Sequence, residues 1–411
     1  MSIIKELKER KILKDITNLE KFENLNPKET GVYVGFDPSA KSLHLGNYIL
    51  ISVLKRFKEF GFNAYALVGG ATGMIGDPSF RDSERVLLNN EQVLANKENI
   101  RKQLESFGLK VIDNYNIYKD MNVLEFLRDA GKLVNVSYML SKESVQKRIE
   151  RGLSFTEFSY QLLQGYDFLS LYKSDGIKVQ VGGSDQWGNI TTGLDMISKI
   201  FPEKHNAVGL TVDLLTDENG NKIGKSTGGG SLWLDKTLSS PFNMYQYLVN
   251  QPDSMVEKLL MWLTFLPVEE IRNILNKHFE NPSAHYAQKI LADEIVKDIF
   301  GKEELKQAQN ITKILFDKNF DVLSLNKKDL EVIENYLPVV ILEKNSNLID
   351  SLIEAKIISS KREAREFIQT NALKLDNNNI DENSLYMPIN YEGKYAIFKK
   401  GKKQTILIKT K

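Results

Sequence analysis

The residues of this 411-residue chain whose types and spacing could perform chemistry lie at the ends of short apolar runs. The run Gly31–Phe36 ends at Asp37, and His44-Leu-Gly-Asn47 then opens an amphipathic stretch. The free N–H groups of a helix start can bind phosphate, and Gly46 has no side chain to keep a purine ring from the backbone. The same residues also suit a capped helix with one surface histidine, and this segment taken alone favours that second interpretation.

A glycine-rich turn follows the second run, Ala64–Val68, and leads to Asp77. Its spacing is not G-x-G-x-x-G, and no Gly-Lys-Ser/Thr follows, so neither a dinucleotide motif nor a phosphate loop is predicted. The glycines indicate either a turn where a ligand approaches the backbone, with Asp77 as a fixed anion, or a tightly packed turn.

A polar stripe runs along one predicted helix. Ser154-Phe-Thr-Glu157 is a capping box, and the helix that it starts continues to about Tyr172. Tyr160, Gln164 and Asp167 recur at i, i+4 and i+7 on its otherwise apolar surface. Buried polar groups need partners, which either neighbouring protein groups or a ligand with an amine and a hydroxyl would supply.

Two later segments carry further polar groups. The run Lys178–Val181 ends in Gly182-Gly-Ser-Asp-Gln-Trp-Gly-Asn189, where Asp185 is well placed for a ribose hydroxyl. Lys222-Ile-Gly-Lys-Ser226 precedes a run of glycines, and its lysines could close over a polyphosphate and neutralise charge on a leaving pyrophosphate. Taken singly, the segment favours a lysine-rich surface loop.

The elements that must position these residues alternate between strand-like and helix-like patterns. This alternation predicts an α/β fold with a parallel sheet, and a 3.6-residue period dominates after about Pro241. We expect a Rossmann-like domain at residues 1–240, a helical domain at 241–325, a linker at 326–345 and a small α+β domain at 346–411.

Composition excludes several classes of protein. Hydrophobic residues make up 42% and charged residues 27%, which is typical of a folded globular chain. The absence of cysteine excludes disulfides, thiolate metal sites and thiol nucleophiles, and none of the four histidines is spaced for a metal site. The longest apolar stretch, Leu259–Val268, is too short to span a membrane, and the N-terminus lacks the apolar core of a signal peptide, so we expect a cytoplasmic protein without a bound metal.

The net charge of +1 conceals an asymmetry, because residues 341–411 hold 13 Lys/Arg and 9 Asp/Glu, a net of +4. Seven lysines and no acidic residue lie between Lys394 and Lys411. Such a segment is either a solvated lysine face or an anion-binding surface, for example for RNA.

The order of the motifs resembles that of a class I aminoacyl-tRNA synthetase, specifically the bacterial-type tyrosyl-tRNA synthetase family. His44-Leu-Gly-Asn47 stands in the family's H-I-G-H position and Lys222-Ile-Gly-Lys-Ser226 in its K-M-S-K-S position. The strings around Tyr33, Asp77 and Tyr160 also match, and the resemblance covers nearly the whole chain.

The resemblance implies a role for individual residues. The implied tyrosine-binding residues are Tyr33 and Asp167 at the phenol, Asp77, Tyr160 and Gln164 at the α-ammonium group, Gln180 in the surrounding shell, and Gln186 near the carboxyl group. The implied ATP-binding residues are Asp37, Ser39, His44, Gly46, Asn47, Asp185 and Lys225, and the implied catalytic residues are His44, Arg81, Arg85, Lys222, Lys225 and Ser226. The tail resembles an S4 RNA-binding module in which Lys361, Arg362 and Arg365 would contact tRNA.

By the same resemblance, the chain is expected to activate L-tyrosine with ATP and Mg²⁺ and to transfer the tyrosyl group to tRNA(Tyr) as a homodimer. Tryptophanyl-tRNA synthetase shares the fold, but Tyr33 and Asp167 suit a phenol. A regulatory RNA-binding protein with an inactive catalytic domain would be expected to lose His44 or the lysine loop, and both are present. An NAD-dependent enzyme lacks the required glycine spacing.

Overall fold

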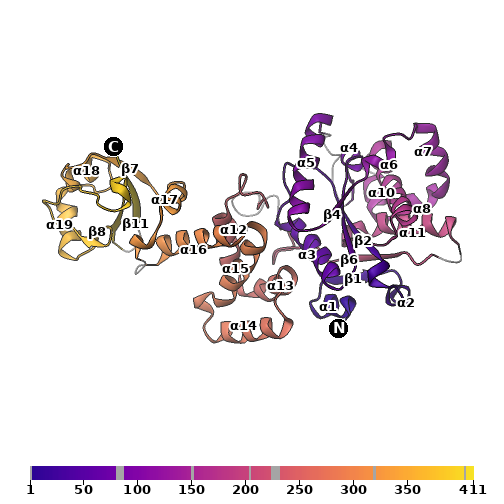
Figure 1. Ribbon diagram of the computed structural model, residues 1–411, viewed down its shortest axis with the longest axis horizontal. Helices are drawn as coiled ribbons and strands as arrows, with labels where there is room; N and C mark the ends of the chain where they lie inside the picture. Colours follow the sequence, from indigo (N-terminus) through magenta and orange to yellow (C-terminus); the bar gives the residue numbers. More distant parts are fainter. Residues whose placement is uncertain are drawn as a thin grey trace. The chain divides into compact units, whose positions relative to one another are not determined.

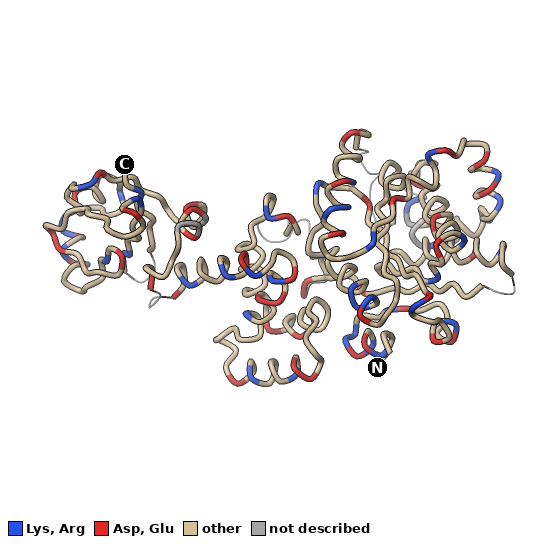
Figure 2. The backbone as a smooth tube through the Cα atoms, viewed as in Figure 1, with Lys and Arg blue, Asp and Glu red and all other residues tan. Residues whose placement is uncertain are grey.

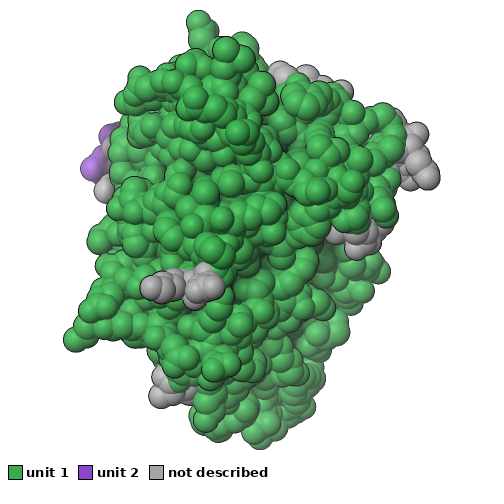
Figure 3. All heavy atoms as spheres, turned by 90° about the vertical axis from the view of Figure 1, so that its right-hand side faces the viewer, with its two compact units in different colours: residues 1–299 green, residues 300–411 purple. Residues whose placement is uncertain are grey.

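The computed structural model describes residues 2–79, 88–149, 152–202, 205–223, 232–317, 321–401 and 404–411. The chain divides into two compact units, Met1–Ile299 and Phe300–Lys411. Figure 3 shows the surface of the first unit in green. No helix in the described part of the chain combines the length and the apolar character needed to cross a membrane.

A six-stranded sheet with the order β1-β6-β5-β2-β3-β4 forms the centre of the first unit. Its strands are β1 (Leu13–Ile16), β2 (Gly31–Phe36), β3 (Asn63–Val68), β4 (Lys110–Asp113), β5 (Ile177–Gly183) and β6 (Val208–Val212). β1 is antiparallel to β6, and all other neighbours are parallel. β2 and β5 are almost completely buried, as expected for parallel strands that are covered on both faces.

Helices cover both faces of this sheet, with α3 and α5 on one face and α10 and α11 on the other (Figure 1). The helices of this part are α1 (Ile3–Glu9), α2 (Leu19–Glu23), α3 (Leu45–Glu59), α4 (Thr72–Ile75), α5 (Asn90–Ser106), α6 (Tyr115–Tyr118), α7 (Val123–Asp129), α8 (Val136–Leu140), α9 (Glu143–Ile149), α10 (Phe155–Ser174) and α11 (Trp187–Ile200). From β2 the chain continues to β3 on one side, whereas β5 pairs on the other. The carboxyl ends of β2 and β5 therefore border the crevice where such sheets bind ligands.

Two glycines let α10 and α11 approach each other closely. A Cβ at Gly165 would lie 3.0 Å from Thr192 Cγ2, and a Cβ at Gly193 would lie 2.9 Å from Phe168 Cβ. Both distances are too short for a side chain without displacement of its neighbour. This packing fixes α10, with its polar stripe, against the middle of α11.

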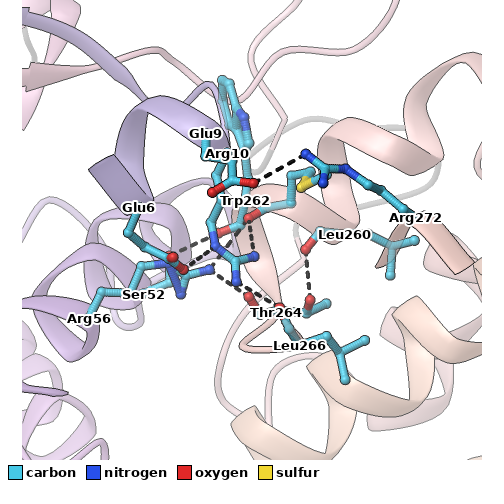
Figure 4. Close-up of polar contacts among 11 residues, drawn as sticks. Glu6, Glu9, Arg10, Ser52, Arg56, Leu260, Trp262, Thr264, Leu266 and Arg272 are labelled. Carbon is cyan, nitrogen blue, oxygen red and sulfur yellow. Dashed lines mark hydrogen bonds and ion pairs between the residues drawn. The ribbon is translucent and has the colours of Figure 1, made fainter. Parts of the chain in front are cut away.

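The first unit continues into a helical region of α12 (Pro241–Val249), α13 (Asp253–Leu263), α14 (Val268–Glu280) and α15 (Tyr286–Phe300). Two buried arginines connect the end of α13 to the sheet region (Figure 4). Arg10 donates to Met261 O at 3.1 Å and to Leu266 O at 2.7 Å, and Arg56 donates to Thr264 O at 2.5 Å. These bonds satisfy carbonyls near the helix end, where positive charge is also favoured by the helix dipole.

The second unit contains a five-stranded sheet with the order β7-β11-β10-β8-β9. Its elements are α16 (Lys302–Phe316), α17 (Lys327–Ile333), β7 (Val339–Leu342), α18 (Leu348–Glu354), α19 (Lys361–Gln369), β8 (Leu373–Leu375), β9 (Asn378–Asn379), β10 (Tyr395–Lys400) and β11 (Gln404–Thr410). An apolar core that includes Leu348, Tyr386 and Phe398 lies between the helices and the sheet.

The predicted fold class is confirmed: a Rossmann-like parallel sheet is followed by helices and by a small α+β region. The strands expected at Gly31–Phe36, Ala64–Val68 and Lys178–Val181 are present as β2, β3 and β5. The sequence indicated a linker at residues 326–345, and the structure has α17 and β7 there, with β7 paired in parallel with β11.

Candidate active site

A pocket of about 330 Å³ opens at the carboxyl ends of β2 and β5. All residues predicted to bind tyrosine or ATP that belong to the described part of the chain line this pocket, as does Lys222, which was predicted to be catalytic. The binding residues are Tyr33, Asp37, Ser39, His44, Gly46, Asn47, Asp77, Tyr160, Gln164, Asp167, Gln180, Asp185 and Gln186. Arg81, Arg85, Lys225 and Ser226 lie outside the described residues. Segments almost 190 positions apart are therefore brought to one crevice.

One end of the pocket holds two buried groups that can pair with a hydroxyl. Tyr33, on β2, is only 1% exposed, and its Oη has no hydrogen-bond partner among the described residues. Asp167, on α10, is also 1% exposed and accepts hydrogen bonds from Asn114 Nδ2 at 2.9 Å and Tyr118 Oη at 2.6 Å. A buried polar atom without a partner is costly, so Tyr33 Oη marks a place where a ligand's polar group would be stabilised.

Burial also changes the ionisation of this end. Desolvation raises the pKa of Asp167 to about 7, although the hydrogen bonds from Tyr118 and Asn114 act in the opposite direction. Burial, and next the charge of Asp167, raise the pKa of the Tyr33 hydroxyl well above its usual value. Tyr33 thus keeps its proton and can donate, whereas Asp167 can accept when it is ionised.

A chain of hydrogen bonds connects this end to Asp37, which follows β2. Asn114 Nδ2 also donates to Thr72 Oγ1 at 3.1 Å, and Thr72 Oγ1 donates to Asp37 Oδ1 at 2.7 Å. The second oxygen of Asp37 accepts from Tyr160 Oη at 2.9 Å. The buried carboxylate of Asp167 and the partly buried carboxylate of Asp37 are therefore both oriented by neutral donors.

A second network orients the other predicted tyrosine-binding groups. Gln186 Nε2 donates to Asp77 Oδ2 at 2.7 Å, and Asn189 Nδ2 lies 3.0 Å from both Gln186 Oε1 and Gln164 Oε1. Asp77 and Gln164 are thus connected through Gln186 and Asn189. Gln180 is 2% exposed, and its Oε1 has no hydrogen-bond partner among the described residues.

The start of α3, where the sequence predicts ATP binding, forms another part of the pocket lining. His44 precedes the helix, and its main-chain N–H donates to Asn47 Oδ1 at 3.0 Å. A Cβ at Gly46 would lie 2.3 Å from Ile223 O, so only glycine permits this approach of the chain next to Lys222. Lys222 Nζ pairs with Asp185 Oδ2 at 2.9 Å, which brings together two residues predicted from distant motifs.

Four residues of these networks had no predicted role: Thr72, Asn114, Tyr118 and Asn189. Thr72 and Asn189 lie inside motif strings that the sequence analysis noted, and their polar character was the available signal. Asn114 and Tyr118 lie in and next to a four-residue helix, for which no sequence pattern was recognised.

The predicted tRNA-binding side chains of the second unit all make ion pairs with acidic residues. Lys361 pairs with Asp350 at 2.9 Å, Arg362 with Glu366 at 3.3 Å, and Arg365 with Glu382 at 2.9 Å. Figure 2 shows basic and acidic residues interspersed along this unit. Since exposed ion pairs contribute little stability, these pairs would not prevent phosphate binding.

Comparison with known proteins shows which family this chain belongs to. The profile of the family described as "tRNA synthetases class I (W and Y)" matches residues 25–317, and that of the "Tyrosine--tRNA ligase SYY-like C-terminal domain" matches residues 329–408. The chain is 67% identical over 410 residues to the tyrosine–tRNA ligase of Mycoplasmopsis agalactiae, with all of both chains covered. It is 56% identical over 409 residues to that of Mycoplasmopsis synoviae, covering 100% of this chain and 99% of that one.

A solved structure agrees with these relatives. The C-terminally truncated mitochondrial tyrosyl-tRNA synthetase of Aspergillus nidulans superposes with a TM-score of 0.70 at 32% identity, covering 77% of this chain and 94% of that one. The fold and the profile match define a class I aminoacyl-tRNA synthetase of the group that includes the tryptophan and tyrosine enzymes. Within that class, the chain belongs to the tyrosine–tRNA ligase family.

Proposed function

We propose that this chain activates L-tyrosine with ATP to form tyrosyl-adenylate and pyrophosphate, and then transfers the tyrosyl group to the 3′ end of tRNA(Tyr) with release of AMP. The observation that carries the choice of tyrosine is the unpartnered Tyr33 hydroxyl in the same pocket end as Asp167. A phenol hydroxyl at this place could accept a hydrogen bond from Tyr33 and donate one to Asp167, so both buried side chains would have a hydrogen-bond partner.

The remaining tyrosine-binding roles are those that the family resemblance implies, and the polar groups in the pocket support them. Asp77, Tyr160 and Gln164 would hold the α-ammonium group, because they offer oxygen acceptors beside the pocket. Gln186 would lie near the carboxyl group, with Gln180 in the shell around it. Asp77 is already hydrogen-bonded to Gln186 at 2.7 Å, which supports a common orientation of the two.

ATP would occupy the crevice at the start of α3. Asp185 would bind the ribose, Asp37, Gly46 and Asn47 would lie along the adenylate, and Ser39 and His44 would meet the phosphates. Lys222, Lys225, Ser226, Arg81 and Arg85 would grip the leaving pyrophosphate, with Mg²⁺ arriving on ATP. The substrate carboxylate would attack the α-phosphorus in line, so the protein would act by positioning and by stabilising charge.

The C-terminal region would bind tRNA through Lys361, Arg362 and Arg365 in an S4-like module. The division into a catalytic domain at 1–240, a helical domain at 241–325, a linker at 326–345 and an RNA-binding domain at 346–411 stays a prediction. We also propose that the reaction takes place in the cytoplasm.

We infer a homodimer from the family, and exposed apolar side chains support it. Val123, Leu124, Val136 and Phe155 are 68%, 74%, 62% and 76% exposed, and all lie within a short stretch of the first unit. A concentration of exposed apolar side chains is typical of a protein interface.

The test is exchange of radiolabelled pyrophosphate into ATP. We expect exchange that depends on tyrosine and is negligible with tryptophan. Exchange without any amino acid, or equal exchange with tryptophan, would overturn the proposed substrate.

The phenol assignment has its own test. Tyr33→Phe should lower kcat/KM for tyrosine modestly, because Asp167 still accepts the phenol proton. Asp167→Asn should lower it much more, since the acceptor is lost. An unchanged ratio of kcat/KM for tyrosine over phenylalanine in both variants would show that other residues recognise the hydroxyl.

A further inference from the structure

Tyr118, at the end of α6, contacts the carboxylate that would recognise the substrate, although no role has been assigned to it. Its Oη lies 2.6 Å from Asp167 Oδ1 and 2.8 Å from Leu163 O. The ring packs against Tyr166, with centroids 6.2 Å apart, and against Phe126, with centroids 5.9 Å apart. The hydroxyl is thus held in place by an aromatic cluster.

The Tyr118 hydroxyl has one proton and faces two acceptors. One acceptor is the carbonyl of Leu163, which lies in the interior of α10 and can already accept a hydrogen bond from a main-chain N–H of the helix. The other acceptor is the buried carboxylate of Asp167. A charged acceptor makes the stronger hydrogen bond, so the proton goes to Asp167 when that group is ionised. Asn114 holds the other oxygen at 2.9 Å, which leaves each oxygen with a lone pair for a further donor.

We propose that Tyr118 is a positioning residue for substrate selection, whose hydroxyl orients the Asp167 carboxylate and favours its charged form so that it can accept the proton of the substrate's phenol. This inference rests on the proposed function and extends it to a residue that reaches the substrate only through Asp167.

The surroundings of Asp167 make the contribution of one hydroxyl large. Three titratable groups interact electrostatically with Asp167: Tyr33 from β2, Tyr118 from α6 and Asp37 after β2. Among the described residues, none of the groups that shift the pKa of Asp167 is a cation. Burial raises that pKa to about 7, so the hydrogen bonds from Tyr118 and Asn114 are what stabilise the charged form.

The test compares Tyr118→Phe with Tyr166→Phe in the full-length protein. Both changes remove one hydroxyl from the same aromatic cluster, but only Tyr118 is hydrogen-bonded to Asp167. Amino-acid-dependent pyrophosphate exchange is measured with tyrosine and with phenylalanine from pH 6 to pH 9, and thermal unfolding is recorded for each variant.

For Tyr118→Phe we expect kcat/KM for tyrosine at pH 7.5 to fall roughly tenfold, as for the loss of a hydrogen bond to a charged group, with little change for phenylalanine. The pH profile of kcat/KM reports groups of the free enzyme. Its acid limb for tyrosine should therefore move to higher pH, and the tyrosine/phenylalanine ratio should recover partly at pH 9. Tyr166→Phe should leave both the ratio and the profile near wild type.

Two outcomes would overturn the inference. One is an unchanged ratio and acid limb in Tyr118→Phe, and the other is an equal fall for both amino acids without a pH shift, which would indicate a purely structural role. Failure of the proposed function would look different, because the wild-type protein itself would then show no tyrosine-dependent exchange.

Discussion

At the scale of the residue, the buried carboxylate of Asp167 connects the proposed substrate specificity with the stability of the fold. Burial raises its pKa from 3.8 to about 7, which means that the folded protein binds a proton more tightly than the unfolded chain does. The contribution of Asp167 to the free energy of unfolding is therefore greatest below its pKa in the unfolded chain, and it is lost as the pH rises from about 4 to about 7. Above that range, the buried charge costs roughly 4 kcal/mol of folding free energy in the empty protein.

We therefore expect Asp167→Asn to stabilise the protein without substrate while it impairs tyrosine activation. The amide fits the existing partners, because its oxygen can accept from Asn114 while its nitrogen donates to Tyr118, whose proton then goes to Leu163 O. Thermal unfolding should show a higher Tm than wild type at pH 8, with the difference shrinking toward pH 4. A lower Tm at pH 8 would contradict the cost assigned to the buried charge.

At the scale of the element, the end of α13 is fixed by two arginines, Arg10 directly after α1 and Arg56 within α3. Arg56, from α3, is 2% exposed, and burial lowers its pKa to about 10, so it remains protonated at neutral pH. Its guanidinium also lies 4.5 Å from the centroid of the Phe265 ring. Because His44, the N-cap of α3, lines the pocket, this contact connects the helical region with the helix whose start borders the candidate active site.

Arg56→Ala should destabilise the protein by about 2 to 4 kcal/mol, since a buried carbonyl of Thr264 loses a charged donor and a cavity remains. Arg272→Ala is the matched control in the same region (Figure 4), because Arg272 is half exposed and pairs with Glu9 at 3.2 Å. An exposed pair contributes about 0 to 1 kcal/mol. Chemical denaturation of both variants measures the difference, and equal losses would refute the distinction.

At the scale of the whole molecule, two family profiles match in succession along one chain, and the first extends past Ile299, where the first compact unit ends. The synthetase profile ends at residue 317, and the C-terminal profile begins at residue 329. The structure also assigns β7 to the C-terminal sheet through its pairing with β11. A cut after Asn345 would therefore leave β7 without its partner strand.

A chain that ends at Asp317 should keep tyrosine-dependent pyrophosphate exchange and lose most tRNA charging. The remaining tRNA binding should also depend less steeply on salt, because fewer phosphates are neutralised. Exchange, aminoacylation and filter binding at several salt concentrations provide the measurements. Loss of exchange in a truncated protein that keeps its helical circular dichroism would refute this division of labour.

The exposed apolar stretch of the first unit gives a second prediction at this scale. Leu124→Asp places a charge on a side chain that is 74% exposed, so the fold of the monomer should tolerate it. If this surface joins two copies, light scattering should show a dimer for wild type and a monomer for the variant at micromolar concentration. A wild-type monomer, or a variant that stays dimeric, would exclude this surface as the interface.

The sequence by itself determined the fold class and the residues that gather in the pocket. Local patterns predicted the sheet, because β2, β3 and β5 are apolar runs that end in polar motifs, and the carboxyl ends of parallel strands meet at one edge of a sheet. Several individual site residues, such as Tyr33 and Gln180, came only from the resemblance of the ordered motifs to the synthetase family. The polar stripe on α10 was also visible as a helical period, and Tyr160, Gln164 and Asp167 all line the pocket.

Only the tertiary structure decided which polar atoms form hydrogen bonds with one another. Tyr118 and Asp167 are 49 positions apart, and Arg10 and Met261 are 251 apart, so no local period relates them. β7 escaped recognition for a similar reason, since its four residues are stabilised as a strand by pairing with β11 near the end of the chain. Hydrogen bonding and burial depend on distance in space, and folding brings together residues that the sequence separates.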